Sequence, residues 1–540
     1  MFKLKKSLLI VMASLATLGA SAEKYILHDV VMNPTGKTKS FAVKNNITEI
    51  NYKKIFNSTE ELEKYLDDIH QELENTRILT DITHSYVVQG KNDDGVNLVI
   101  AQYTFDESHS MIVFPKPTFD TNDGIEVKFK LKDSNFLGLM NTMNIDINTQ
   151  FGDEDHPDNY SRVTLGFNFD YDYPFNKGIT KNTWSNALEF NWAMADSSAE
   201  FNYLTGITIG VPFGEGHQAN FTVSQGISRN LDYEIFGDEL YFTESCGIAV
   251  PFIIGYLDNT TAVVYTPNIG FNYYWDMDGI HNDNKYLNQN PILTFGHNIA
   301  INHVNWIKGN NFRNGYKFSA EQGIGWNFGA DDLNKSIVPT ASGNVQFFKA
   351  FKYAGIAINI DAFAGYNSTK NMGKFIRGAA DRQTYDDQYN IDIYNYALES
   401  PCAIVFNFDL PIHVVTTHWL DWFNTIFGDY ETKPKAIRAI ALVPRKLFRY
   451  LDFEMQVNPF VDVGLFKNRA TGHNFDIYEG IYTGGLEVLI YPERWRSFVV
   501  RASLGYDVGA KILDGHLGFD SSWRDPSKLW EAYFGLGLHF

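Results

Sequence analysis

From about residue 110 to the last residue, apolar side chains alternate with polar or small ones in one run after another. Turns rich in Gly, Asn and Asp separate these runs. A period of two places successive side chains on opposite faces of a β-strand, whereas a helix needs a period of 3.6. One clear run sets Phe453, Met455, Val457, Val461 and Val463 against Glu454, Gln456, Asn458 and Asp462. The pattern predicts a mainly β fold for most of the chain.

A soluble β-sandwich and a membrane β-barrel both show this alternation, but the apolar face points inward in the sandwich and outward, toward lipid, in the barrel. The barrel is favoured because many runs reach about ten residues, aromatic residues gather at their ends, and the polar faces carry charges. The 42 Phe, 30 Tyr and 42 Gly, with a mean hydropathy of only −0.24, agree with this interpretation. We therefore predict a transmembrane antiparallel β-barrel over residues 109–540, with about sixteen strands or, alternatively, eighteen.

The last residues of the sequence repeat the alternation. Counted back by twos, one face carries Phe540, Leu538, Leu536, Phe534, Ala532 and Trp530. The interleaved residues are small or polar. We expect a final barrel strand whose apolar face includes Phe534, Leu536, Leu538 and Phe540.

The first 22 residues have the order of a secretory signal peptide. Lys3, Lys5 and Lys6 precede a short apolar segment, and Ala20-Ser21-Ala22 provides small residues for cleavage. The apolar segment is too short to anchor the chain as a transmembrane helix. The sequence thus predicts an exported protein that is cleaved near Ala22.

Residues 23–108 differ from the rest because they contain a helical pattern. Ser58 and Glu61 have the spacing of a capping box, and Leu62, Tyr65, Leu66, Ile69 and Leu73 then fall on one helical face. Strand patterns occur at residues 25–31, 80–89 and 95–105, and a short helix is expected at 38–46. We predict a small α+β domain whose open strand edges could add an extended peptide.

Composition and motifs exclude several other functions. A formal net charge of −19 argues against a nucleic-acid binder. The sequence has no nucleophile elbow, HExxH or phosphate-binding loop, so we predict neither an enzyme nor a cofactor or metal site. The acidic residues Asp276, Asp278 and Asp283 lack the complete calcium-loop pattern and are interpreted as a solvated turn. Cys246 and Cys402 are expected to be free thiols.

Four separated features resemble the BamA-type outer-membrane assembly and secretion family. The α+β unit resembles a POTRA domain, and Asp133, Asn135 and Gly138 fit the D-x-N-F-L-G turn between early barrel strands. Ile376, Arg377 and Gly378, in a long loop at about residues 368–400, resemble the V-R-G motif of the loop that folds into the lumen. Phe460, Asp462 and Gly464 match the F-x-D-x-G strand motif, and the sequence ends on an aromatic residue, as the family's final strand does when it is recognised for insertion.

This resemblance implies a bacterial outer-membrane barrel with its N-terminal domain in the periplasm. The implied function is insertion, assembly or translocation of polypeptides. The implied partners are outer-membrane lipids, unfolded outer-membrane or secreted clients, and periplasmic chaperones or accessory lipoproteins. The alternative is a closed, porin-like or structural barrel whose POTRA-like unit serves as a docking module.

The alternation also gives a physical reason to pair two of these motifs. It places Asp462 on the lumen side of its strand, and an arginine on a loop inside the lumen needs a carboxylate partner. The alternative is that Arg377 and Asp462 are both solvated. Taken with the resemblance, we expect the two side chains to pair and to fix the position of the loop.

Three features depart from the family pattern. Ala379 follows the Arg-Gly pair where the family usually has an aromatic residue, and only one POTRA-sized unit fits before the barrel. The 416–450 segment contains an amphipathic helix pattern with Trp419, Trp422 and Phe423, followed by six basic residues. These basic residues are Lys433, Lys435, Arg438, Arg445, Lys446 and Arg449. The helix could lie at a membrane surface or cap the mouth of the barrel, and both alternatives stay open.

Overall fold

The computed structural model describes residues 23–540 except 121–123, 152–158, 196–197, 215–216, 230–239, 276–290, 308, 331, 380–384, 387–390, 393–397, 428–431, 436–437, 439–450 and 524–528. The predicted signal peptide, the acidic turn at residues 276–283 and the basic residues from Arg445 onward therefore lie outside the described residues. The chain divides into two compact units. The first comprises residues up to Glu74 and Leu79–Glu107, and the second comprises Asn75–Ile78 and Ser108–Phe540.

The first unit is a four-stranded sheet with two helices. Its elements are β1 (Tyr25–Pro34), α2 (Ser40–Asn45), β2 (Ile55–Phe56), α3 (Thr59–Asn75), β3 (Leu79–Lys91) and β4 (Asn97–Glu107). The strand order is β2-β1-β4-β3, in which β1 and β4 are parallel and β3 and β4 form an antiparallel hairpin. Strand β3 is thus an edge of the sheet.

Helix α3 begins and packs as its sequence predicts. The Ser58 hydroxyl accepts a hydrogen bond from the backbone N–H of Glu61, and the Glu61 carboxylate accepts one from the N–H of Asn57. The five apolar residues at helical spacing, Leu62, Tyr65, Leu66, Ile69 and Leu73, are all buried. The hairpin turn between β3 and β4 uses Gly95 at a positive φ of 76°.

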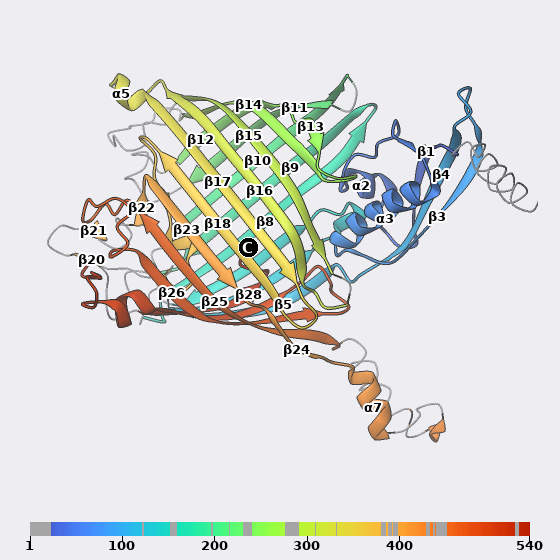
Figure 1. Cartoon of the computed structure of the whole chain (residues 1–540). Coiled ribbons are helices and arrows are strands. Elements are labelled where there is room, and N and C mark those ends of the chain that lie inside the picture. The colour runs from blue at the N-terminus through green and yellow to red at the C-terminus, as the bar shows by residue number, and fades with distance from the viewer. Residues whose placement is uncertain are drawn as a thin grey trace, which may run out of the picture. The chain divides into compact units, whose positions relative to one another are not determined.

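The second unit is a closed barrel of antiparallel strands (Figure 1). Before the long loop its segments are β5 (Met111–Asp120), β6 (Gly124–Asp133), β7 (Met143–Phe151), β8 (Val163–Lys177), β9 (Thr180–Ala193), β10 (Ser198–Phe213), β11 (His217–Arg229), β12 (Leu240–Ala249), β13 (Phe252–Tyr256), β14 (Ala262–Trp275), β15 (Ile292–Trp306), β16 (Arg313–Asn327), β17 (Ile337–Ala350) and β18 (Gly355–Gly365). After it come β23 (Cys402–Asp409), β24 (Ile412–Thr416), β25 (Phe453–Phe466), β26 (Ile481–Pro492), β27 (Val500–Asp507) and β28 (Trp530–Leu536).

Two pairs of these segments are single strands that a proline interrupts. Segments β12 and β13 both pair with β14, and Pro251 lies between them. Segments β23 and β24 both pair with β25, and Pro411 lies between them. A proline cannot donate to the ladder, so each strand breaks there. The twenty described segments therefore make eighteen strands rather than the expected sixteen, and eighteen was the alternative.

The burial of side chains on the strands is inverted relative to that in a soluble sandwich. On β25, Asp462 is fully buried, with 0% of its surface exposed, whereas the neighbouring Val461 is 49% exposed. The polar residues Glu454, Gln456 and Asn458 are buried as well, on the same face as Asp462. The predicted alternation thus has its apolar face outward and its polar face toward the lumen.

We call the end of the barrel where β5 begins and β28 finishes the near end, and the opposite end the far end. Strands β28 and β5 are neighbours and close the barrel. Every other strand is paired residue by residue with both of its neighbours, but no such run of pairs joins β28 to β5 among the described residues. At the near end, the β26–β27 turn crosses this seam: the Trp495 indole N–H donates to the carbonyl of Met111, and the hydroxyls of Ser497 and Ser134 are hydrogen-bonded.

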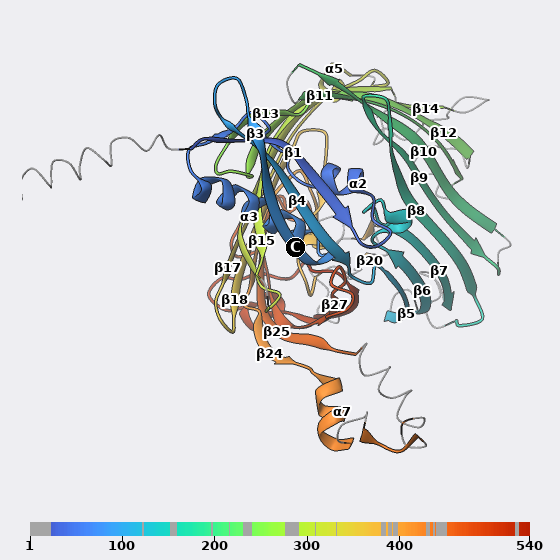
Figure 2. The same cartoon turned by 90° about the vertical axis from the view of Figure 1, so that its right-hand side faces the viewer.

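Strand β28 ends earlier than the sequence pattern predicts. Gly537 has a φ of 101°, and the chain turns away from the sheet there. Phe534 and Leu536 belong to β28, but Leu538 and Phe540 do not continue its outward face. The end of the chain, marked C, lies within the outline of the barrel in both views (Figures 1 and 2). The expectation of an apolar face that extends to Phe540 is therefore wrong for its last two residues.

Helix α7 (Trp419–Phe427) lies in the connection between β24 and β25, where the amphipathic pattern was found. It begins with a hydrogen bond from the Trp419 N–H to the Asp452 carboxylate. Both views show it outside the barrel opening and not across it (Figures 1 and 2). Among the described residues, no helix combines the length and the apolar character needed to cross a bilayer.

Candidate functional site

The long loop between β18 and β23 folds back into the barrel and places Arg377 against the lumen wall. Its described elements include β19 (Lys370–Asn371), the 3-10 turn Gly373–Phe375 and β22 (Glu399–Ser400), and β19 pairs with β22. Two further short strands, β20 (Tyr385–Asp386) and β21 (Ile391–Asp392), pair near the tip of the loop. Residues 376–379 follow the 3-10 turn and are buried.

The Arg377 guanidinium binds carboxylates from three barrel strands. Its Nε and Nη2 donate to the two oxygens of Asp462, at 2.9 and 2.7 Å. Nη2 also donates to Asp409 at 2.6 Å, and Nη1 lies 3.2 Å from the Glu487 carboxylate. The backbone N–H of Arg377 donates to Asp462 as well, at 2.9 Å. The ring of Phe460 lies under the guanidinium, with its centroid 3.7 Å from Cζ.

Arg377 lies among three buried acids, one of which, Glu487, also faces a second cation, Arg501, at 3.5 Å. Burial alone would lower the pKa of Arg377, but the hydrogen bonds and charges of Asp462, Asp409 and Glu487 outweigh it and raise the pKa. Arg377 is therefore always charged, and its planar fork suits the two-point contact with Asp462. Removal of the arginine would leave uncompensated carboxylates in a buried site, at a cost of several kcal/mol.

Gly378 brings the loop backbone into direct contact with β27. A Cβ atom on Gly378 would lie 2.9 Å from the carbonyl carbon of Gly505, and one on Gly505 would lie 2.7 Å from the Gly378 nitrogen. Gly378 also has a φ of 83°, which disfavours any other residue. Its N–H donates to the Glu531 carboxylate of β28 at 2.6 Å. Both glycines are thus required for this approach.

Ile376 explains the glycine of the F-x-D-x-G motif. A Cβ on Gly464 would lie 2.3 Å from Cδ1 of Ile376, so any larger residue would force the buried Ile376 side chain to shift. Ile376 belongs to a buried cluster that also contains Met372, Ala379, Leu398, Ala403, Val405, Phe466, Ile481 and Trp523. Ala379, the departure from the family pattern, is fully buried in the same cluster as Trp523.

The early turn motif builds the β6–β7 turn from its own residues. The Asp133 carboxylate accepts from the N–H of Asn135, and the Asn135 side-chain oxygen accepts from the N–H of Met140. Gly138 has a φ of 73°, and its N–H donates to the carbonyl of Asn135. These residues lie in the near-end turn and serve its local conformation.

Sequence reasoning missed four residues that contact Arg377 or Gly378: Asp409 on β23, Glu487 on β26, Gly505 on β27 and Glu531 on β28. The two glutamates and the aspartate lie on the lumen-facing side of their strands. Their place in the alternation was the only sequence signal that could have indicated them. With Asp462 on β25, the loop contacts each of the last five strands of the barrel.

A second polar cluster lies in the β25–β26 connection. His473, Asp476 and Glu479 have potential ligand atoms within 4.8 Å of one another. The Glu479 carboxylate interacts with His473 and Thr471, and its hydrogen bond raises the pKa of the exposed His473. These bonds fix the loop. Cys246 and Cys402, as expected, are free thiols.

No family model matches the sequence, and no curated protein does. Among solved structures, the chain is similar to CdiB from Acinetobacter baumannii, with 12% identity, a TM-score of 0.43 and coverage of 95% of this chain and 73% of that one. BamA from Haemophilus ducreyi lacking POTRA domains 1–3 gives 11% identity, a TM-score of 0.37 and coverage of 95% and 85%. CdiB from Escherichia coli gives 9%, 0.39, 96% and 91%. At such identities, the function of this chain has to come from its own residues.

Proposed function

We propose that the chain is an outer-membrane barrel of the BamA-type family that inserts, assembles or translocates polypeptides without enzymatic chemistry. The observation that carries this proposal is the position of the Arg377 loop. The loop contacts the inner side of the last five strands, and its hydrogen bond to Glu531 is made to β28, the strand that borders the β28–β5 seam. A passive pore needs no such link between a lumen loop and the edge of its sheet.

The outward face supports a place in a bilayer. Large apolar side chains such as Val461, Leu486 and Leu504 are about half exposed on successive strands, whereas the residues that alternate with them are polar or small. A closed barrel satisfies its backbone hydrogen bonds internally, as a membrane requires. In the outer membrane, the near end would face the periplasm and the far end the outside.

The proposed mechanism is physical. A client strand adds to the edge that β28 or β5 presents when the seam opens, or an extended chain passes through the lumen. The hydrogen bonds of Arg377 to Asp462 and Asp409, and that of Gly378 to Glu531, favour the state in which the loop is docked against the barrel wall. The fraction of molecules in which the seam is open then depends on the free energy with which the loop binds strands β25 to β28.

The N-terminal unit has a surface suited to extended peptides. Its edge strand β3 exposes Val87 and Val88, at 58% and 44% of their surfaces. We propose that residues 1–22 are removed on export and that residues 23–108 form a periplasmic POTRA-like domain. This domain would receive clients, chaperones or accessory lipoproteins through strand addition.

Depletion of the protein tests this function. The outer-membrane and secreted proteomes are compared before and after depletion, and with a copy carrying Arg377→Ala. The proposal predicts the loss of a defined set of barrels or secreted proteins, with partial loss in the variant. If both proteomes stay unchanged while solute uptake falls, the chain is a closed porin-like barrel with a docking module.

A further inference from the structure

The last four residues of the sequence occupy a site inside the near end of the barrel. Gly537 donates its N–H to the carbonyl of Val499 and turns the chain inward. Leu538 then packs on the apolar cluster of Leu489, Tyr491 and Val499. The chain thus leaves the sheet at Gly537, and the residues after it pack against this apolar cluster.

Phe540 is held by two residues of strands that do not adjoin β28. Its ring stacks on Phe348 of β17, with centroids 6.4 Å apart and planes at 29°. The oxygen of Phe540 accepts a hydrogen bond of 2.6 Å from Nη1 of Arg313 on β16. The Arg313 guanidinium also lies over Phe348, 4.0 Å from its centroid. One cation therefore binds both the aromatic wall of the site and the tail.

Arg313 has no other hydrogen-bond acceptor among the described residues. Its guanidinium has five donors and is partly buried, so an acceptor at this position stabilises it. The two acids that line the same cavity, Asp409 and Glu487, bind Arg377 instead. The main-chain oxygen of Phe540 therefore supplies Arg313 with a hydrogen-bond acceptor.

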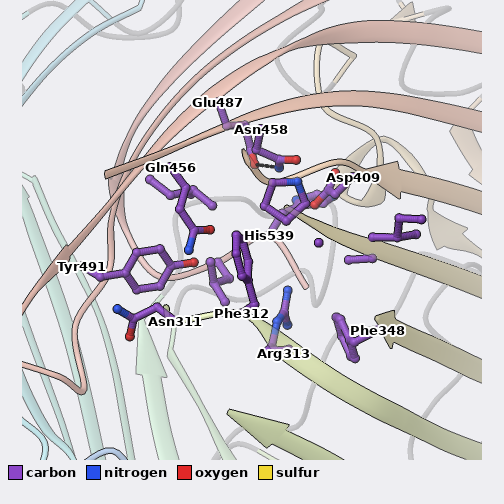
Figure 3. A pocket seen from close by; sticks show the side chains of 16 residues that line it. Asn311, Phe312, Arg313, Phe348, Asp409, Gln456, Asn458, Glu487, Tyr491 and His539 are labelled. Carbon is purple, nitrogen blue, oxygen red and sulfur yellow. Dashed lines mark hydrogen bonds between the residues drawn. The ribbon is translucent and has the colours of Figure 1, made fainter. Parts of the chain in front are cut away.

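A cavity of about 30 Å³ adjoins the tail (Figure 3). His539 points into it, facing polar side chains that include Asn458, Gln456 and Tyr491 (Figure 3). Asp409 and Glu487 also line this cavity, so the tail site and the Arg377 cluster share two wall residues.

We propose that Arg313 and Phe348 form a binding site for an aromatic residue and its main-chain oxygen, which the chain fills with its own Phe540. The occupied site is a latch. It ties β28, the strand at the seam, to β16 and β17, and β28 cannot leave the sheet at its near end unless Phe540 leaves the site. The inference concerns the position of the tail and does not require that the barrel handles polypeptides.

Thiol labelling at position 539 tests the latch in the full-length folded protein. His539→Cys is introduced together with Cys246→Ser and Cys402→Ser, and its alkylation by a water-soluble maleimide is timed. Phe348→Ala removes the stacking partner. Phe347→Ala is the matched control, because Phe347 is the neighbouring residue on β17 and points outward, where it is 47% exposed.

The latch predicts slow alkylation in the parent and in Phe347→Ala. Alkylation should become about tenfold faster in Phe348→Ala and in Arg313→Gln, because each loses a contact that holds the tail. Since Arg313→Gln could impair folding, Phe540→Gly provides a variant of the tail itself and should label equally fast. Fast labelling in the parent, or equal rates in Phe348→Ala and Phe347→Ala, would overturn the proposal.

Discussion

Arg377 and Asp462 give the sharpest test at the scale of single residues. We expect Arg377→Ala and Asp462→Ala to impair function to a similar degree, and the double variant to be no worse than either, because the two changes remove one shared interaction. The coupling in a double-mutant cycle should be ~0.5–3 kcal/mol. Activity of each variant in a depletion strain is the measurement, with barrel assembly as the control.

The geometry of the guanidinium also matters at this site. Arg377→Lys keeps the charge but cannot reproduce contacts to Asp462, Asp409 and Glu487 from one planar group, so it should remain defective. Strictly additive effects of the two alanine changes, or a normal Arg377→Ala variant, would show that the loop does not depend on this cluster.

Gly464 offers a test of packing with a built-in control. Gly464→Ala would place its Cβ 2.3 Å from Ile376, whereas Gly484→Ala, on the neighbouring strand, meets no atom closer than 3.6 Å. We expect Gly464→Ala to increase protease cleavage within the 368–400 loop and Gly484→Ala to leave it unchanged. Ile376→Ala added to Gly464→Ala should restore protection, because it removes the clash. Equal cleavage in both glycine variants would contradict this account.

The sequence was informative for these residues only where a local pattern carried the signal. Asp462 could be placed in the lumen from alternation alone, and the motif indicated Arg377 as its partner. Asp409, Glu487 and Glu531 could not be assigned to the site, since their approach to the loop depends on which strands are neighbours and in what register. The small size of Gly505 likewise has a reason only in the folded barrel, where Gly378 packs against it.

At the scale of elements, the connection between β24 and β25 is separable from the barrel. The pairing of these strands continues to Thr416 and Glu454, and Thr417 and Phe453 then close its base with hydrogen bonds of 2.9 Å. Replacement of residues 418–452 by a short Asn-Gly turn should therefore leave barrel assembly intact. The heat-modifiable migration of the folded barrel in a detergent gel measures this. Loss of the folded band would show that α7 is part of the barrel's structure.

Strand number and strand ends were the least predictable features of the elements. Alternation identifies a strand but does not reveal that Pro251 and Pro411 each interrupt one, and so the sequence leaves sixteen and eighteen strands as alternatives. The apolar alternation also continues in the sequence beyond the end of β28. Leu538 and Phe540 still occupy alternate positions, although the chain has already turned away from the sheet at Gly537. After the loop the structure has five strands, because β23 and β24 are two parts of one strand.

At the scale of the whole molecule, the barrel combines a weakly joined seam with two internal ties. The Arg377 loop holds the last five strands from inside, and the tail holds β28 at the near end. The α+β unit and the barrel were each evident from the sequence because their periodicities differ. The seam was not, since it depends on how the first and last strands meet.

The central claim is that this seam opens, and a disulfide across it tests that claim most directly. In the Cys246→Ser, Cys402→Ser background, cysteine pairs are scanned between residues 111–115 of β5 and residues 532–536 of β28. The control pair is Val457→Cys with Val488→Cys, which joins the registered strands β25 and β26. The account predicts that oxidised seam pairs lose function, that reduction restores it, and that the control pair works in either state. Full function with a completely crosslinked seam would contradict it.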